Sequence, residues 1–152
     1  MEEARFDFDT GITVSNGGLN APLGDMEKYV RFLLGRAETE AGAAVLSRSS
    51  LEEMWKPVVV VETVGEDRVD MGLCFFIEKR GRRLLIGHSG SQNGFISHLY
   101  LDPAARAGYV VSFNTDATDE VPVPNTRKLD AEMREFFVAN VAPVLEGASR
   151  SR

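Results

Sequence analysis

The residues best suited to chemistry lie together in the segment Gly87–Phe95, GHSGSQNGF, which holds one histidine, two serines and three glycines. Apolar runs typical of strands flank this segment, with Leu84–Ile86 before it and Ile96–Leu101 after it. Glycines let a backbone approach a neighbouring group closely, because no Cβ stands in the way. We therefore expect backbone N–H groups of this segment to face a ligand, and the serines and histidine to contact a substrate.

The sequence HSGSQNGF resembles the third active-site motif of the serine β-lactamase and penicillin-binding-protein family, especially its class C and esterase-like branch. In that family Lys-Thr-Gly or His-Ser/Thr-Gly lies on an edge strand beside the nucleophile. Four further pieces are similar, in order and spacing, to the family's C-terminal half: SNGGLNAPLGDMEKYVRFLLG, LSRSSLEEMWKP, MGLCFF and FNTDA. Together the similar pieces extend over about residues 6 to 140.

The resemblance implies a role for each motif residue. His88 takes the position of the usual lysine, beside the nucleophile, where it sets the proton balance and the positive field. Ser89 would hydrogen-bond the substrate carboxylate or acyl neighbour, and Gly90 keeps the strand edge clear. Ser91 matches the residue whose backbone N–H forms half of the oxyanion hole, worth about 3 kcal/mol per donor. Asn114, in FNTD, resembles an asparagine near the substrate carboxylate. The histidine in place of lysine favours esterase-like members over β-lactam or D-Ala-D-Ala substrates.

The family's nucleophile lies in Ser-x-x-Lys, which this sequence lacks. None of its lysines follows a serine by three residues: Lys28, Lys56, Lys79 and Lys128. The second motif, Tyr-x-Asn or Ser-x-Asn, occurs only at Ser91–Asn93 and Ser112–Asn114, at or after the third motif instead of before it, so we treat both as chance.

We therefore expect the C-terminal portion of a β-lactamase-like serine hydrolase, which supplies the third motif and half of the oxyanion hole. The full-length protein would act on a small-molecule ester, β-lactam or peptide amide, and the missing N-terminal half is the partner that would carry the nucleophile. The chain alone is predicted to be inactive. The alternative is a non-catalytic binding or interaction module derived from that fold.

Other chemistries fit the same residues less well. GHSGS nearly matches the nucleophile elbow Gly-x-Ser-x-Gly, which would make Ser89 the nucleophile, but a helix should follow and the next residues are β-rich. His88 and His98 on neighbouring strands could bind a metal, yet no cysteine or carboxylate joins them at ligand spacing, so we expect an ordinary hydrogen-bonded pair. The glycines lack the lysine of a phosphate-binding loop. No metal and no cofactor are expected.

Composition sets the class of protein. The 152 residues, 43% of them hydrophobic, suit one soluble globular domain. A net charge of -6 opposes binding to nucleic acid or anionic membranes. No signal peptide and no membrane-spanning run occur, so the chain as given would be cytoplasmic, although a longer parent could be exported. Cys74 is the single cysteine, which excludes an internal disulfide and suggests a small buried residue.

Helices are expected where apolar residues recur at helical spacing or caps occur: Pro22–Gly35, Ser47–Trp55 with Ser47 or Ser49 as N-cap, and Thr126–Leu145. Six apolar residues of the last helix should cover a sheet face: Leu129, Met133, Phe136, Phe137, Val141 and Leu145. Pro143 should end the regular part of this helix, and a polar tail, Gly147–Arg152, should follow. Phe6–Val14 predicts a short strand or extended arm, and Asp116–Asn125 a loop.

Strand patterns run through the middle of the chain: Val58–Val64, Val69–Glu78, Arg82–His88, Phe95–Leu101 and Gly108–Asn114. The links between the last four are short, with the glycine-rich motif as one of them, which forces antiparallel pairing. We therefore predict an α+β fold, with an antiparallel sheet of three to five strands, two helices before it and a long C-terminal helix packed on one face. Residues 1–152 would form a single domain, in which residues 6–57 return from the family's helical lobe and residues 58–145 form the sheet and helix.

Overall fold

The computed structural model describes residues 17, 20–35, 45–92, 94–115 and 126–150. Its centre is one antiparallel sheet of six strands that pair in sequence order: β1 (Val59–Val64), β2 (Asp67–Met71), β3 (Phe76–Arg80), β4 (Arg83–Gln92), β5 (Phe95–Asp102) and β6 (Ala107–Phe113). The predicted α+β class and antiparallel meander are confirmed, with more strands than expected. The arm at 6–14 and the loop at 116–125 lie outside the described residues.

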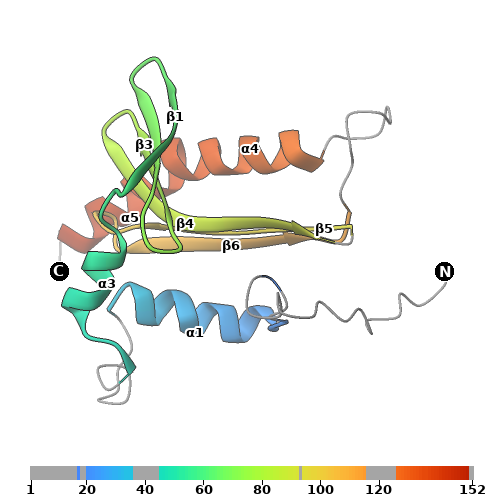
Figure 1. Cartoon of the computed structure of the whole chain (residues 1–152), viewed down its shortest axis with the longest axis horizontal. Coiled ribbons are helices and arrows are strands. Elements are labelled where there is room, and N and C mark those ends of the chain that lie inside the picture. Colours follow the sequence, from blue (N-terminus) through green and yellow to red (C-terminus); the bar gives the residue numbers. More distant parts are fainter. Residues whose placement is uncertain (1–16, 18–19, 36–44, 93, 116–125, 151–152) are drawn as a thin grey trace.

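Helices cover both faces of the sheet (Figure 1). On one face lie α1 (Leu23–Leu33) and α3 (Arg48–Met54); on the other lie α4 (Thr126–Phe136), a π-helical segment (Phe137–Val141) and α5 (Ala142–Arg150). Each face has its own core. Val30, Leu33 and Trp55 pack with strand residues such as Leu99 on the α1 face, while Phe137 packs with Leu85 and Tyr100 on the α4 face. Among the described helices, none is long and apolar enough to cross a membrane.

The two early helices form where the sequence predicts them. In α1 the residues Val30 and Leu33 are buried against the sheet. Before α3 the Ser47 hydroxyl accepts a hydrogen bond from the Ser50 backbone N–H at 3.1 Å, which satisfies one of the helix's free N-terminal donors. The Trp55 ring that follows packs edge-on against Phe75 at 6.3 Å. Ser47 is therefore the N-cap, and packing is the role of Trp55.

The single predicted strand Val69–Glu78 is wrong, because a tight turn divides it into β2 and β3. The Gly72 N–H donates to the Phe75 carbonyl at 2.8 Å, and a Cβ on Gly72 would lie 2.3 Å from the Met54 carbonyl oxygen. The chain can therefore pass α3 only with glycine at this position. Cys74 lies in the turn at φ 63° and is exposed, so its predicted burial is also wrong.

The glycine-rich motif is part of a strand and not a link between strands. β4 runs through it to Gln92, and the turn to β5 comes at Gly94, whose φ of 79° favours glycine. A continuous strand also excludes the nucleophile elbow, which needs a sharp turn and a helix after Ser89. The third-motif segment, His88–Ser91, therefore lies in regular extended backbone.

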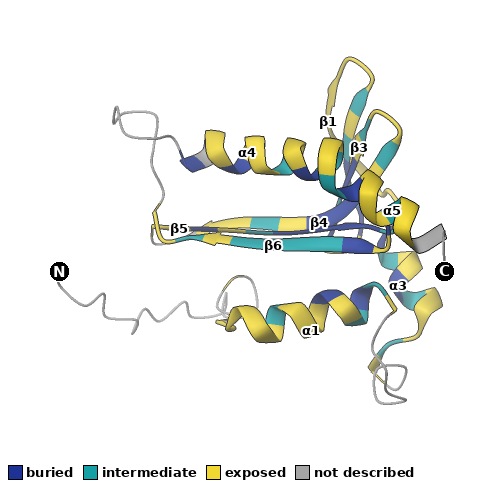
Figure 2. Ribbon diagram, turned by 180° about the vertical axis from the view of Figure 1, so that it is seen from behind, coloured by how far each residue is buried: buried dark blue, intermediate teal, exposed yellow. Residues whose placement is uncertain are grey.

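The C-terminal helix departs from prediction in its length and in the face it buries. Pro143 does not end it: the Ala142 N–H reaches back to the Phe137 carbonyl, this wider π turn precedes the proline, and α5 continues to Arg150. Phe137 is buried as predicted. Four residues expected on the sheet are instead exposed: Leu129, Met133, Phe136 and Leu145. Asp130 is buried and Arg134 mostly so. The buried parts of α4 lie on the side of the helix that faces the sheet, and its exposed parts lie on the opposite side (Figure 2).

Candidate functional site

The third-motif segment distributes its side chains over both faces of the sheet. In the β4–β5 register His88 pairs with Leu99, Ser89 with His98, Gly90 with Ser97 and Ser91 with Ile96. Directly opposed residues share a face. Leu99 belongs to the core beside α1, so the exposed His88 lies on the α1 face of the sheet.

Ser89 and Ser91 consequently lie on the α4 face. Asn114 follows the end of β6, two residues after Ser112, which pairs with Ser97 and so shares the α1 face. The structure thus places His88 on the α1 face and the two serines on the α4 face, while Asn114 lies beyond the last residue of β6.

The third-motif segment extends past the end of β3. The β3–β4 pairing ends at Phe76 opposite Gly87, and β4 continues to Gln92. The Phe76 ring lies against the His88 ring with 5.2 Å between their centroids. Along this segment β4 therefore has no β3 residue paired with it among the described residues. An extended ligand or another polypeptide can approach a strand at such a position.

The three motif glycines serve three different purposes. A Cβ on Gly87 would lie 2.0 Å from the Leu99 carbonyl oxygen and 2.7 Å from Cδ1 of Tyr100, so this glycine makes room inside the protein. Gly90 has no atom within 4 Å of the same position, and Gly94 provides the turn. Gly90 and Gly94 both have the open surroundings expected beside a ligand, and Gly90 is the one of the two that lies within β4. The expectation for Gly87 is wrong.

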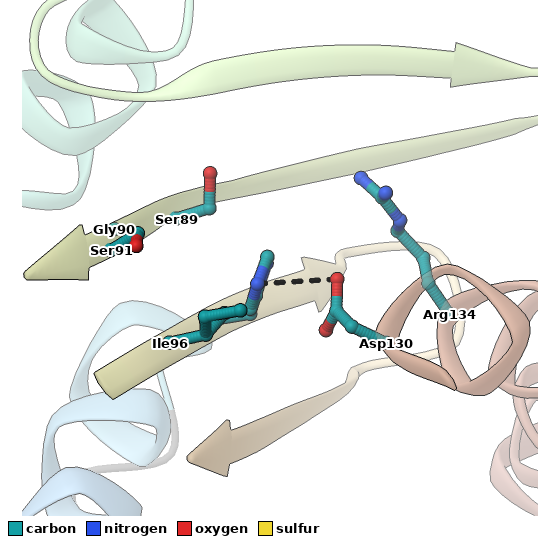
Figure 3. A pocket seen from close by; sticks show the side chains of 7 residues that line it. Ser89, Gly90, Ser91, Ile96, Asp130 and Arg134 are labelled. Atoms are coloured by element: carbon teal, nitrogen blue, oxygen red, sulfur yellow. Dashed lines mark ion pairs between the residues drawn. The ribbon is translucent and has the colours of Figure 1, made fainter. Parts of the chain in front are cut away.

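A hollow of ≈ 360 Å³ opens on the α4 face beside the two serines (Figure 3). It is lined by residues from β4, β5 and α4: Ser89, Gly90, Ser91, Ile96, His98, Asp130 and Arg134. In Figure 3 the Asp130 and Arg134 side chains extend from α4 toward the two strands. The hollow therefore combines hydroxyl, imidazole, carboxylate and guanidinium groups.

His98 and Asp130 form the closest polar contact of this hollow. Nε2 of His98 is 3.2 Å from Oδ2 of Asp130, and the side chains are 11% and 6% exposed. Neither ring nitrogen of His98 is aligned for a hydrogen bond with any described residue, and Oδ1 of Asp130 also lacks one. The expected hydrogen-bonded pair of His88 and His98 is therefore wrong, because the two histidines lie on opposite faces.

Burial lowers the pKa of His98 below its ordinary value, and the Arg134 charge acts in the same direction. The carboxylates of Asp130 and Glu78 oppose this shift but do not reverse it. The desolvation cost of a buried imidazolium exceeds the attraction of the nearby carboxylates. His98 is consequently a neutral imidazole at neutral pH, with one nitrogen able to accept a proton.

A second polar cluster adjoins the hollow and is centred on the buried Glu78 of β3. The Tyr100 hydroxyl donates to Oε1 of Glu78 at 2.7 Å, and Nη1 of Arg134 donates to the same oxygen at 2.9 Å. Arg80 pairs with Oε2 at 3.0 Å. Burial raises the pKa of Tyr100, so its hydroxyl stays protonated and donates. Glu78 is therefore a buried carboxylate with its charge satisfied.

Sequence reasoning placed His98 on a strand beside the motif but paired it with His88, and it did not find Asp130 or Arg134 as neighbours of the motif. Asp130 and Arg134 are four residues apart, and Phe137 and Val141 continue the same helical face. This spacing was a signal in the sequence. Polar residues on the same helical face as buried apolar residues indicate that the polar side chains also contact the sheet. Among the described residues no group of His, Cys, Asp and Glu is arranged to hold a metal ion.

The antiparallel sheet, with helices on both faces and a histidine- and serine-bearing strand beyond the end of β3, is a serine-hydrolase-like fold. A family model described as Beta-lactamase matches residues 2–133. The chain therefore belongs to the Beta-lactamase family, and the resemblance inferred from the motifs is confirmed. A search of curated proteins gave no match.

Proposed function

We propose that this chain supplies the oxyanion and substrate-binding side of a serine acyl-transfer hydrolase, and that another polypeptide segment supplies the Ser-x-x-Lys nucleophile. The observation that carries the proposal is that β4 continues beyond Gly87, its last residue paired with β3, and bears His88–Ser91 on this continuation. Backbone N–H groups on such a strand can stabilise the oxyanion of an acyl-transfer intermediate. Family membership supports an ester, β-lactam or peptide amide as substrate.

Each motif residue has a proposed role. Ser91 contributes its backbone N–H to the oxyanion hole, and His88, which is exposed on the α1 face, lies beside the incoming nucleophile and sets its protonation. Gly90 leaves the strand surface open, in agreement with the free space around it. Ser89 and Asn114 bind the substrate's carboxylate or acyl neighbour. Histidine in place of the family's lysine favours an ester over a β-lactam.

We also propose that residues 1–152 act as one structural unit, in which residues 6–57 return from a helical lobe and residues 58–145 form the sheet and C-terminal helix. Leu33 and Trp55 share a core with Leu99 and Leu101 of the sheet, which supports joint folding of the two parts. The nucleophile-bearing segment would then be a separate unit that docks beside β4.

Reconstitution tests the function. The purified chain is mixed with the polypeptide encoded upstream, if it carries Ser-x-x-Lys and Tyr-x-Asn, and turnover of a p-nitrophenyl ester and nitrocefin is measured. Fluorophosphonate and fluorescent penicillin labelling, followed by intact mass, locates the nucleophile. We expect no turnover and no label with the chain alone, and a label on the added polypeptide in the mixture. A label on Ser89, or rapid turnover by the chain alone, would refute the proposal.

Variants separate site residues from scaffold. His88→Ala should lower the reconstituted ester kcat by about 100-fold, the lower end of the effect of a general acid–base group. Ser112→Ala, at an exposed position on the same face of β6, is the matched control and should leave kcat unchanged. An equal loss in both variants would point to damage of the sheet and not to chemistry. A natural start at Met1 with no such upstream polypeptide would favour a binding module.

A further inference from the structure

Helix α4 is joined to both strands that flank β4. Tyr100 of β5 pairs with Gly87, and its ring packs where a side chain at Gly87 would stand. Its hydroxyl thereby reaches Glu78 on β3 at 2.7 Å, across the start of the third-motif strand. Arg134 of α4 donates to Glu78 and to the Tyr100 hydroxyl, at 2.9 and 3.1 Å. Contacts from α4 to β3 and β5 therefore fix the start of β4 between these two strands.

One helical turn earlier, α4 makes a second and looser contact. Asp130 lies 3.2 Å from His98, and His98 is the residue directly opposite Ser89. The first contact is fully hydrogen-bonded, whereas the second leaves both ring nitrogens and Oδ1 of Asp130 without a hydrogen bond among the described residues. A contact of this kind, buried but incompletely paired, changes in strength when one partner gains a proton.

We propose that His98 and Asp130 are positioning residues for the third-motif segment, and that the protonation state of His98 adjusts the placement of Ser89–Ser91. This inference rests on the proposed function, because it assigns a control to the same strand. A proton on His98 turns a contact between a neutral ring and a carboxylate into a charged pair. The pair draws β5 toward α4, and β4 follows because seven residue pairs, from Ile86–Leu101 to Gln92–Phe95, join it to β5.

The other charged and titratable groups around His98 have hydrogen-bond or ion-pair partners, or stay neutral. On α4 Arg134 is engaged by Glu78, and Glu78 of β3 is also bound by Arg80 and the Tyr100 hydroxyl. Tyr109 of β6, near Asp130, has its pKa raised by burial and stays neutral. Because burial lowers the pKa of His98, it is the group of this cluster that gains a proton as the pH falls below the ordinary range of histidine.

The position of the segment matters for acyl transfer because oxyanion donors act only at hydrogen-bonding distance, and shifts of about 0.5 Å degrade such geometry. Residues that touch no substrate can therefore control the reaction. His98 and Asp130 act in this way through Ser89, because His98 lies directly opposite Ser89 in the β4–β5 pairing and the polar atoms of both residues are buried.

The test uses the 152-residue chain itself, labelled with ¹⁵N, and needs no catalysis. The amide signals of Ser89, Gly90 and Ser91 and the ring signal of His98 are followed by NMR between about pH 5 and pH 8, where histidines titrate. We expect the three amides to titrate together with His98. In Asp130→Asn the shared titration should move to lower pH and lose at least about half of its amplitude, because the carboxylate that attracts the proton is gone.

Glu132→Gln, an exposed change on the same helix, is the matched control and should reproduce the wild-type titration. If Asp130→Asn fails to fold, His98→Gln is measured instead and should abolish the titration of the three amides. Amides that stay constant while His98 titrates, or that titrate unchanged in Asp130→Asn, would overturn the inference. A failed reconstitution would refute the proposed function while this titration remained.

Discussion

Gly87 and Gly90 belong to the same motif but differ in what surrounds them. A Cβ at Gly87 meets the Leu99 backbone oxygen at 2.0 Å, which cannot move aside without disturbing the β4–β5 pairing, whereas the position at Gly90 is open. We expect Gly87→Ala to lower the free energy of unfolding by about 3 kcal/mol, the upper end of overpacking effects. Gly90→Ala should change it by less than about 0.5 kcal/mol.

Urea denaturation of the two variants measures this difference. Strand propensity alone would favour alanine at both positions, since glycine weakens a strand. A loss of stability in Gly87→Ala would therefore result from steric overlap of the new Cβ with Leu99 and Tyr100. Equal midpoints for the two variants would contradict the packing described for Gly87.

His98 makes the stability of the chain depend on pH. Its pKa in the folded state lies below the ordinary 6.5, so the unfolded state binds a proton more readily. The stability due to neutral His98 is complete above 6.5 and is lost as the pH falls through the lower folded-state pKa. We expect the urea midpoint to fall on acidification from about pH 7 to pH 5, and His98→Gln to reduce this slope.

The matched control is His88→Gln, because His88 is exposed on the opposite face of the sheet. This variant should keep the wild-type slope between about pH 7 and pH 5. A slope that disappears in His88→Gln but persists in His98→Gln would show that the burial of His98 has been assigned incorrectly.

The motif could be found from sequence, whereas the pairing of His98 with Asp130 could not. His, Ser and Gly in a short apolar-flanked segment indicate a site by residue type alone. The contact of His98 with Asp130 depends on which face α4 turns to the sheet, and two residues 32 positions apart carry no local signal of proximity. The sequence also did not show on which face of the sheet each serine lies, because this depends on the β4–β5 register.

At the scale of elements, α4 is attached to the sheet through charge as well as apolar area. Arg134 holds the buried Glu78, so Arg134→Met would leave that carboxylate with only Arg80 and Tyr100. Removing one partner of a buried pair costs about 3 kcal/mol at the low end of the usual range. We expect that loss in the free energy of unfolding, measured by urea denaturation.

Glu132→Gln serves as the control for Arg134→Met. It removes the exposed Lys128–Glu132 pair, whose atoms are 3.9 Å apart, and exposed pairs contribute less than about 1 kcal/mol. If both variants lose the same stability, Arg134 does not hold Glu78 in the way its distances indicate.

The meander could be predicted because short links between strands allow only antiparallel pairing. The ends of β1, β5 and β6 each lie within one residue of the predicted bounds. The β2–β3 turn was missed because MGLCFF is apolar throughout, and its break is imposed by the Met54 carbonyl against Gly72. The face of α4 was missed because Leu129 and Met133 are more apolar than Asp130 and Arg134, and polar pairing with Glu78 outweighed that pattern.

At the scale of the whole molecule, the sheet is covered unevenly. Helices lie over β4, β5 and β6, while β1 extends past the level of α4 (Figure 1). Every residue of β1 is exposed, with Val59 at 59% and both Val60 and Val61 at 53%. Among the described strands β1 pairs with β2 alone, at the end of the sheet order. An exposed apolar strand at a sheet edge can pair with another chain.

We therefore expect the purified chain to associate as its concentration rises, through β1. Val60→Lys adds a charge to the exposed strand and should weaken association by about tenfold, equal to about 1.4 kcal/mol. Sedimentation equilibrium measures the constant. Glu66→Gln, in the exposed turn after β1, changes the net charge by the same amount and should leave association unchanged. Equal weakening in both variants would attribute association to net charge, and a monomer at every concentration would show that the β1 edge resists pairing despite its valines.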